Sequence, residues 1–336
     1  MTAEEQDVMY MRRCLQLARC GREGAAPNPM VGAVIVCEGR IIGEGYHRKC
    51  GGPHAEVNAV SSVREPGMLP RSTMYVSLEP CAHYGKTPPC ADLIIEKRIP
   101  RVVVGCMDPF ARVNGLGIKK LRDAGVDVHV GVLEAECMRL NRRFMTFHRL
   151  HRPWVTLKWA QSADGFVDCK RASGVPPVRL SSSYTQVLVH RMRALSKAIM
   201  VGTDTVISDN PTLTTRFWPG ENPLRLTIDR HGRIPQDAHL LDGSVPTRVY
   251  HDKDLCTILT DLHASGVQSL LVEGGPCLLE SFLESGLWDE ARVEEAPCLL
   301  HDGVRAPFLK EECLLERRQV DGRWITCYEH EGRENR

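Results

Sequence analysis

Four residues in the first third of the chain combine metal-ligand and proton-transfer chemistry. His54 offers an imidazole nitrogen, and Cys81 and Cys90 offer two thiolates. This donor set suits Zn²⁺, and three protein ligands leave a fourth tetrahedral position for a water molecule, whose pKa zinc lowers to about 7. Glu56 follows the histidine by two positions and is not needed as a ligand, so it is the candidate to carry the proton. The four residues predict a catalytic zinc site.

The order of these residues matches the signature of zinc-dependent nucleobase deaminases, in which His-x-Glu is followed by Pro-Cys and a second cysteine. The alternative, in which both cysteines are ordinary buried thiols and His54 is a surface helix cap, leaves the order of four residue types unexplained. Eight residues separate Cys81 from Cys90, whereas the nucleobase deaminase signature has two. The longer insert carries His83, Lys86 and Thr87, which suit contact with a phosphate group.

A helix start and a strand end must bring these residues together. Positions i and i+2 of a regular helix point away from each other, so His54 and Glu56 can share a site only at the beginning of a helix, which Pro53 favours. We expect helices at 4–20, 54–64, 91–97, 118–124 and 134–147, and strands at 31–37, 40–46, 73–78, 102–106 and 126–130. This alternation predicts an α/β sheet covered on both faces, with ligands at the carboxyl ends of its strands.

A second α/β unit follows the basic segment that ends at Pro153. We expect domains at 1–148 and 153–336, joined by a linker at 149–152. The expected strands are 155–160, 198–201, 224–228 and 267–272, and the expected helices are 186–195, one ending at 261–264, and 278–283. Gly274-Gly275 lies between a strand and a helix, where it is either a phosphate cradle or a tight turn without a ligand. The turn at 202–205 leaves the same two alternatives open.

Composition narrows the ligand class. The formal charge is +1, from 43 basic and 42 acidic residues among 336, so no global field recruits nucleic acid or an anionic membrane. We therefore expect a small-molecule substrate, no nucleic-acid partner and no membrane partner. Fourteen cysteines beside an acidic N-terminus without signal-peptide features predict a cytoplasmic protein with reduced thiols. We also expect a homo-oligomer, of a size that the sequence does not give.

The motifs Pro27–Gly32, Gly45–His47, Pro53–Glu56 and Leu78–Cys90 together resemble the bifunctional riboflavin-biosynthesis enzymes. That family deaminates a diaminopyrimidinone ribosyl phosphate and then reduces its ribose, and the resemblance covers residues 5–290. It implies a cytidine-deaminase-like three-layer domain followed by a dihydrofolate-reductase-like domain. It also implies that His54, Cys81 and Cys90 bind zinc, that Glu56 shuttles protons, and that Asn28, His47, His83 and Lys86 contact the phosphorylated pyrimidine substrate.

The second half resembles the reductase of the same family, which takes its hydride from NADPH. The matching stretches are Leu157–Gly165, Arg193-Ala194, Val201–Thr203 and Asp209–Arg216. Carried over by position, the implied cofactor contacts are Ala160, Arg179, Thr205, Asp209, Arg230, Gly274 and Gly275. The implied substrate contacts are Lys158, Ser181, Arg193, Leu213, Arg216 and Glu273. Guanidinium groups among them suit phosphate, because they pair with it through two parallel hydrogen bonds.

Several positions depart from the family pattern. Phe110 replaces an asparagine, Arg230 a small hydroxyl residue, Cys298 a lysine, and Pro176-Pro177 polar residues. These departures leave open a chain that retains only the deaminase activity beside a degenerate reductase domain. A nucleic-acid base deaminase and a non-catalytic, zinc-stabilised interaction protein are further alternatives.

Overall fold

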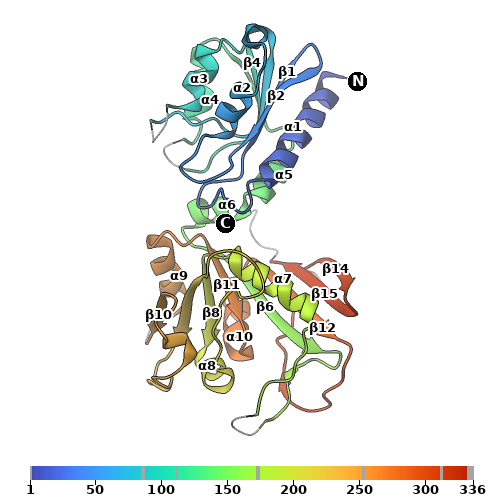
Figure 1. Ribbon diagram of the computed structural model, residues 1–336, viewed down its shortest axis with the longest axis vertical. Coiled ribbons are helices and arrows are strands. Elements are labelled where there is room, and N and C mark those ends of the chain that lie inside the picture. The colour runs from blue at the N-terminus through green and yellow to red at the C-terminus, as the bar shows by residue number, and fades with distance from the viewer. Residues whose placement is uncertain are drawn as a thin grey trace. The chain divides into compact units, whose positions relative to one another are not determined.

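The structure is a computed structural model, which describes residues 2–84, 88–110, 113–171, 175–251, 254–310 and 313–330. Lys86, an expected substrate contact, lies outside the described residues. The chain divides into two compact units, residues 1–150 and 151–336 (Figure 1). In the described part of the chain, no helix is both long enough and apolar enough to cross a membrane.

One five-stranded sheet forms the centre of the first unit, in the order β2-β1-β3-β4-β5. Its strands are β1 (Gly32–Cys37), β2 (Arg40–Tyr46), β3 (Thr73–Leu78), β4 (Arg101–Cys106) and β5 (Asp127–Val130). β1 is antiparallel to β2 and β3, whereas β3, β4 and β5 are parallel. The expected hairpin is confirmed, because Glu38 and Gly39 between β1 and β2 both have the positive φ of a tight hairpin turn.

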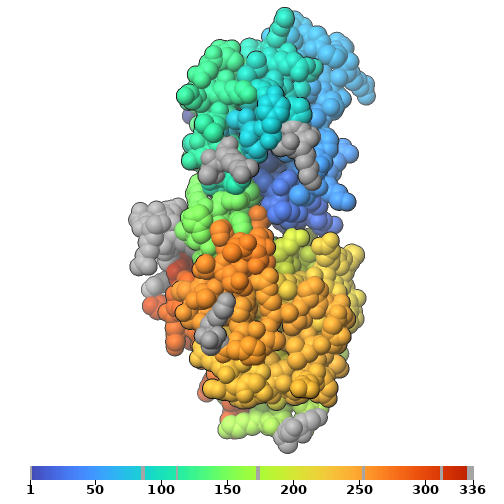
Figure 2. All heavy atoms as spheres, turned by 90° about the vertical axis from the view of Figure 1, so that its left-hand side faces the viewer, coloured from blue at the N-terminus to red at the C-terminus, as the bar shows by residue number. Residues whose placement is uncertain are grey.

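Helices cover both faces of this sheet, which confirms the expected three-layer domain. α1 (Ala3–Arg19) and α5 (Glu134–Leu140) lie on one face, and α2 (Ala55–Ser61), α3 (Cys90–Glu96) and α4 (Leu116–Asp123) lie on the other. A short 3₁₀ helix, η1 (Pro66–Arg71), precedes β3. Ala33 and Ile35 of β1 pack into one core while Val34 and Val36 pack into the other, as the two-residue period of a strand requires. Figure 2 shows the surface on the side of α3 and α4, in cyan to green.

The single helix expected at 134–147 is a wrong prediction, because Asn141 divides it into α5 and α6 (Arg142–Leu150). The buried Asn141 carboxamide binds both backbone groups of Met30: Met30 N donates to Oδ1 at 2.8 Å and Nδ2 donates to Met30 O at 2.9 Å. The break thus attaches the two helices to the loop that precedes β1. α6 extends to Leu150, so the first two residues of the expected linker are helical.

An eight-stranded sheet forms the second unit, in the order β10-β9-β8-β11-β6-β12-β15-β14. The strands are β6 (Trp154–Ser162), β8 (Ala198–Gly202), β9 (Leu224–Ile228), β10 (Thr247–Tyr250), β11 (Ser269–Glu273), β12 (Glu290–Ala296), β14 (Leu314–Val320) and β15 (Arg323–Glu329). The strands from β10 to β12 are parallel, and β15 and β14 are antiparallel additions at one edge. β7 (Phe166–Asp168) and β13 (Val304–Arg305) form a small separate sheet.

Helices also cover both faces of the eight-stranded sheet. α9 (Leu255–Ala264) and α10 (Pro276–Glu284) pack on one face, and α7 (Ser183–Ala194) and α8 (Thr203–Asp209) pack on the other (Figure 1). Two turns singled out in the sequence join parallel strands to helices: Gly202 leads from β8 to α8, and Gly274-Gly275 leads from β11 to α10. Both turns lie at carboxyl ends of strands, where ligands bind in open α/β sheets.

Candidate active sites

The three candidate zinc ligands converge at the carboxyl end of β3. Cys81 follows that strand by three residues, Cys90 begins α3, and His54 is the N-cap of α2. His54 Nδ1 lies 3.6 Å from Cys81 Sγ and 3.4 Å from Cys90 Sγ. With Zn–N near 2.0 Å and Zn–S near 2.3 Å, nitrogen and sulfur ligands of one tetrahedral zinc ion lie about 3.6 Å apart. The donor set and its spacing therefore fit zinc.

The start of α2 places Glu56 beside these ligands. His54 has an extended backbone, with φ −71° and ψ 168°, and the helix begins at the next residue. Glu56 is in the first turn, is only 3% exposed, and interacts through its carboxyl group with the Cys90 thiol. The helix start thus resolves the conflict between i and i+2 positions in the way that Pro53 suggested.

The two thiols of this cluster shift each other's pKa. A hydrogen bond with Cys90 is the largest cause that lowers the pKa of the Cys81 thiol, and His54 lowers it further. The same hydrogen bond raises the pKa of Cys90, and burial adds to the rise. Two sulfurs this close titrate as a pair. A divalent cation removes the competition, because it stabilises both groups as thiolates.

Burial gives Glu56 the proton affinity of a general acid and base. It raises the pKa of this carboxyl group to about 7, with a further contribution from the negative charge of Cys81 that His54 partly offsets. A bound divalent cation would lower this value. A carboxyl group whose pKa is near neutrality can both accept and release a proton during one turnover.

Asn28 and His47 lie together next to the ligand histidine. His47 Nδ1 is 3.0 Å from Pro53 O, which can only accept, so Nδ1 carries the proton and Nε2 accepts from Asn28 Nδ2 at 3.1 Å. Burial lowers the pKa of His47, which keeps the ring neutral. The ring packs edge-on against His54, with 5.5 Å between centroids. This arrangement fixes the Asn28 carboxamide and leaves its oxygen as the atom suited to accept from a substrate amine.

His83, in the insert between the two cysteines, contacts Phe110. Their ring centroids are 6.2 Å apart in an edge-on arrangement, and Phe110 also lies 5.1 Å from the ring of His148 in α6. His83 Nδ1 is buried and has no hydrogen-bond partner among the described residues. Phe110 stands at the position of the family asparagine, so an aromatic contact to His83 replaces whatever polar contact that asparagine makes.

A cavity of about 1080 Å³ lies at the carboxyl ends of β6, β8 and β11 in the second unit. Of the residues expected to bind substrate, Lys158, Ser181, Arg193, Leu213 and Glu273 line it. Of the expected cofactor contacts, Ala160, Arg179, Thr205, Asp209, Gly274 and Gly275 line it. The volume is at the upper end of the range of small-molecule sites, as needed for a substrate together with a dinucleotide.

Charged groups are buried along one wall of this cavity. Arg193 pairs with Glu273 through two hydrogen bonds, Nε to Oε1 at 3.0 Å and Nη2 to Oε2 at 2.8 Å. Burial opposes ionisation of Glu273, but Arg193 and Lys158 outweigh it and lower the pKa of that carboxyl group. Burial also lowers the pKa of Lys158, although Glu273 and Glu294 favour its charged form. Lys158 thus presents an ammonium group with an increased tendency to release a proton.

The glycine turn after β11 requires both of its glycines. Gly274 and Gly275 have φ of 74° and 62°, and a Cβ on Gly275 would lie 2.9 Å from Thr205 Oγ1. Bare backbone therefore meets the start of α8 at the cavity wall.

Sequence reasoning missed Arg171, which lines the same cavity and joins Asp168 to Asp209 by ion pairs. Its signal was weak, since arginines in loops are usually solvated.

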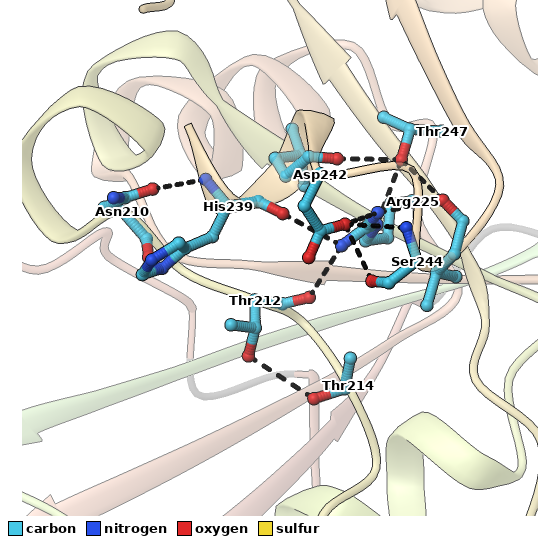
Figure 3. A network of polar contacts seen from close by, with 10 residues as sticks. Asn210, Thr212, Thr214, Arg225, His239, Asp242, Ser244 and Thr247 are labelled. Carbon is cyan, nitrogen blue, oxygen red and sulfur yellow. Dashed lines mark hydrogen bonds and ion pairs between the residues drawn. The ribbon is translucent and has the colours of Figure 1, made fainter. Parts of the chain in front are cut away.

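Leu213 reaches the cavity because a buried arginine holds its loop. Arg225 of β9 is fully buried and donates from Nη1 to Thr212 O at 3.4 Å and from Nη2 to Asp242 Oδ1 at 2.8 Å (Figure 3). The backbone of His239, in the 3₁₀ helix η2 (His239–Leu241), accepts from Nη1 at 3.1 Å and donates to Asn210 Oδ1 at 2.7 Å. The sequence did carry a signal here, because a charged residue interrupts an otherwise uncharged, largely apolar strand.

Two expected contacts lie away from the cavity lining. Arg216 is exposed, with its guanidinium hydrogen-bonded to Thr212 and Thr214. Arg230 lines a separate hollow of about 290 Å³ with the first turn of α9 and part of α10. The hollow approaches the cavity along α10, where Leu278 lines the hollow and the adjacent Leu279 lines the cavity.

Comparison with known proteins decides the family. Residues 4–106 match the family described as the cytidine and deoxycytidylate deaminase zinc-binding region, and residues 153–321 match the RibD C-terminal domain. The riboflavin biosynthesis protein RibD of Aquifex aeolicus is 40% identical over 323 residues, with 89% of each chain covered. That of Escherichia coli is 36% identical over 335 residues, covering 89% of this chain and 90% of its own. The chain belongs to the RibD family.

Solved RibD structures have the same fold. Acinetobacter baumannii RibD superposes with a TM-score of 0.86 at 33% identity, over 97% of this chain and 99% of its own. A Thermotoga maritima protein, a diaminohydroxyphosphoribosylaminopyrimidine deaminase and 5-amino-6-(5-phosphoribosylamino)uracil reductase, gives 0.85 at 32% identity, over 98% and 100%. This chain is therefore a bifunctional deaminase and reductase of riboflavin biosynthesis, with zinc and NADPH as its cofactors. The predicted fold class, activity and cofactors are confirmed, and the alternatives are not favoured.

The site geometry yields a prediction for Glu56→Gln, which preserves shape but cannot accept a proton. We expect ammonia release to fall by about 10²–10⁴-fold, the usual contribution of a general acid or base. Metal analysis should find the zinc content unchanged, because Glu56 is not among the converging donors. The reductase activity of the same polypeptide is the internal control, and wild-type ammonia release by this variant would exclude Glu56 as the proton carrier.

Proposed function

We propose that the first unit deaminates 2,5-diamino-6-(5-phosphoribosylamino)pyrimidin-4-one and that the second reduces the ribosyl group of the product to a ribityl chain. The observation that carries this proposal is the convergence of His54 Nδ1, Cys81 Sγ and Cys90 Sγ beside the buried Glu56. The Thermotoga relative is named for its action on both pyrimidines, which supports the choice of substrate.

In the deaminase, we assign the zinc ligands to His54, Cys81 and Cys90. Zinc, when bound, supplies Lewis-acid activation of a water molecule. Glu56 takes a proton from that water and passes it to the departing amine, a task suited to a carboxyl group whose pKa is raised by burial. Asn28, held by the neutral His47, orients the pyrimidine edge, and His83 contacts the same substrate.

In the reductase, the cavity charges orient the ribosyl phosphate. NADPH supplies the hydride. Lys158 donates a proton to the ribose oxygen as the ring opens, which its lowered pKa favours. Arg193 and Glu273 hold each other rigidly at the cavity wall and hydrogen-bond to the substrate, together with Ser181 and the backbone around Leu213. Arg216 is the outermost of these groups and captures the phosphate from solvent.

The cofactor lies over the glycine turn. The N–H groups of Gly274 and Gly275 at the start of α10, with Thr205, contact its pyrophosphate, as helix N-termini commonly do. Asp209, held by Arg171, and Ala160 and Arg179 complete the contacts inside the cavity. Arg230 binds the phosphate-bearing adenosine end in the adjoining hollow, where it stands in place of the family's hydroxyl residue.

We further propose a cytoplasmic homo-oligomer. β14 is an exposed edge strand that carries Leu314 and Leu315, which are 49% and 43% exposed. These two leucines are the apolar part of an edge that continues with the charged Glu316, Arg317 and Arg318, and we take the leucines as the contact to a second copy. The fourteen cysteines are unpaired, which supports a reducing compartment. Sedimentation of the purified protein measures the oligomeric state.

The proposed function is tested by mass spectrometry of the product made from the diaminopyrimidinone, with and without NADPH. Without NADPH, the product should show replacement of an amine by oxygen. With NADPH, it should also gain one hydride and one proton. Exchange without the second gain would leave a deaminase alone, and deamination of tRNA or DNA oligonucleotides in place of the small substrate would favour a nucleic-acid deaminase.

Replacing Lys158 by Met removes the ammonium group and keeps most of the side-chain volume. We expect the kcat of the reductase to fall by about 10²-fold or more, the loss typical of removing a general acid. NADPH consumption on the deaminated pyrimidine measures the effect. The Kd for NADPH and the deaminase rate should stay within twofold or so of wild type, and an unchanged kcat would remove Lys158 from the reaction.

Replacing Arg230 by Ser restores the small hydroxyl residue of the family. This substitution should affect the KM values for NADPH and for NADH differently. A charge-assisted hydrogen bond to phosphate is worth about 1.5–3 kcal/mol, so the KM for NADPH should rise by about 10-fold or more. The KM for NADH, which lacks the additional phosphate, should hardly change. Equal effects on both cofactors would place Arg230 away from that phosphate.

A further inference from the structure

Glu79, two residues before a zinc ligand, is buried and takes no part in metal binding or proton transfer. It follows β3 directly, is 4% exposed, and its backbone N–H donates to Cys106 O at 3.0 Å. Its carboxylate accepts four backbone hydrogen bonds. These come from Gly115 at 2.9 Å and Asp108 at 3.3 Å to Oε2, and from Gly117 at 2.9 Å and Ile118 at 3.3 Å to Oε1.

These bonds make Glu79 the cap of α4. The first N–H groups of a helix have no partner within the helix, and its N-terminus favours negative charge. The N-cap residue of α4 is Gly115, which has no side chain and a φ of 86°. The carboxylate of Glu79 therefore supplies from another segment the acceptor that an N-cap side chain usually provides. It also holds the loop after β4 through Asp108 N.

The segment between Glu79 and Cys81 lies directly on the start of this helix. A Cβ on Gly117 would be 1.9 Å from Pro80 O, so the backbone of Pro80 fits only against a glycine. On its other side, Cys81 O accepts from Ala91 N at 3.1 Å and Cys81 Sγ accepts from Cys90 N at 3.3 Å. Cys81 is thus held between the starts of α3 and α4, and Glu79 makes the connection to α4.

We propose that Glu79 is a positioning residue of the zinc site, whose carboxylate fixes the Cys81 thiolate by tying the end of β3 to the N-terminus of α4. This inference rests on the proposed role of Cys81 as a zinc ligand. Partners that orient metal ligands affect metal affinity although they do not touch the metal, and removing them typically weakens binding by about 10–100-fold.

The test variant is Glu79→Gln. Whichever way the carboxamide turns, its NH₂ group faces two backbone N–H donors, so half of the cap is lost while the shape stays. The matched control is Asp7→Asn, which alters a buried carboxylate of the same unit, where Asp7 pairs with Arg101 and accepts from Tyr75. Tyr75 and Arg101 lie in the amino-terminal halves of β3 and β4, whereas Cys81 follows the carboxyl end of β3.

The readouts are zinc affinity by chelator competition and the absorption spectrum of cobalt-substituted protein, which reports the thiolate ligands. We expect Glu79→Gln to weaken zinc binding by about 10–100-fold and to alter the cobalt spectrum. Asp7→Asn should leave both at wild-type values, whatever it does to the melting temperature. Reductase activity of each preparation confirms equal amounts of intact chain.

Unchanged affinity and spectrum in Glu79→Gln would overturn the inference, as would an equal loss in Asp7→Asn. If Glu79→Gln does not fold, Glu79→Asp decides instead, because it keeps the charge but is one methylene too short to reach both Gly115 N and Gly117 N. That variant should also show weaker zinc binding and an altered cobalt spectrum, and wild-type values would count against the role of Glu79. Absence of cobalt binding in the wild-type protein would instead refute the proposed zinc site itself.

Discussion

The meeting of one imidazole nitrogen and two sulfurs at a single point is the constraint on which the first unit depends. The partly buried Cys81 thiol and the buried Cys90 thiol compete for one proton, since their hydrogen bond lowers the pKa of Cys81 and raises that of Cys90. Such a cluster is unfavourable unless a cation binds it as thiolates. The sheet, the start of α2 and the start of α3 all contribute one donor, so the fold of the whole unit is needed to keep the donors together.

The second unit must keep side chains ionised in a partly buried cavity, where burial favours their neutral forms. Glu273 remains ionised because Arg193 binds it bidentately and Lys158 lies near. Arg225 is buried still more deeply, and its guanidinium is hydrogen-bonded to side chains and backbone carbonyls around it. In both cases a planar guanidinium with several donors makes burial of charge tolerable.

The sequence pointed to the cluster of His54, Cys81 and Cys90 because these residue types in this order are rarely combined by chance. It also predicted the parallel strands β6, β8, β9 and β11, whose apolar runs are distinctive, but it missed the parallel strands β10 and β12 and the antiparallel strands β14 and β15. Charged residues break the pattern in β12 and β14. Residues that position other groups also could not be recognised from the sequence, because their contacts are distant in the chain. Glu79 and Glu294 act through contacts to segments distant in the chain: Glu294 accepts from Ser181 Oγ at 2.9 Å across more than a hundred residues.

The net charge of the whole chain did not predict that the ligands of the reductase would be anions. Its formal value of +1 argued against polyanionic partners, yet the substrate and NADPH both carry phosphate. Around the cavity, Asp168 and Asp209 are paired with Arg171, Glu273 with Arg193 and Asp204 with Arg233. Among the described lining residues this pairing leaves Lys158 and Arg179 as cations without an acidic partner in an ion pair, whereas Arg171 is shared by two carboxylates. Which of the charges around the cavity can meet an anion therefore depends on how they are paired, and a net count over the sequence cannot register that.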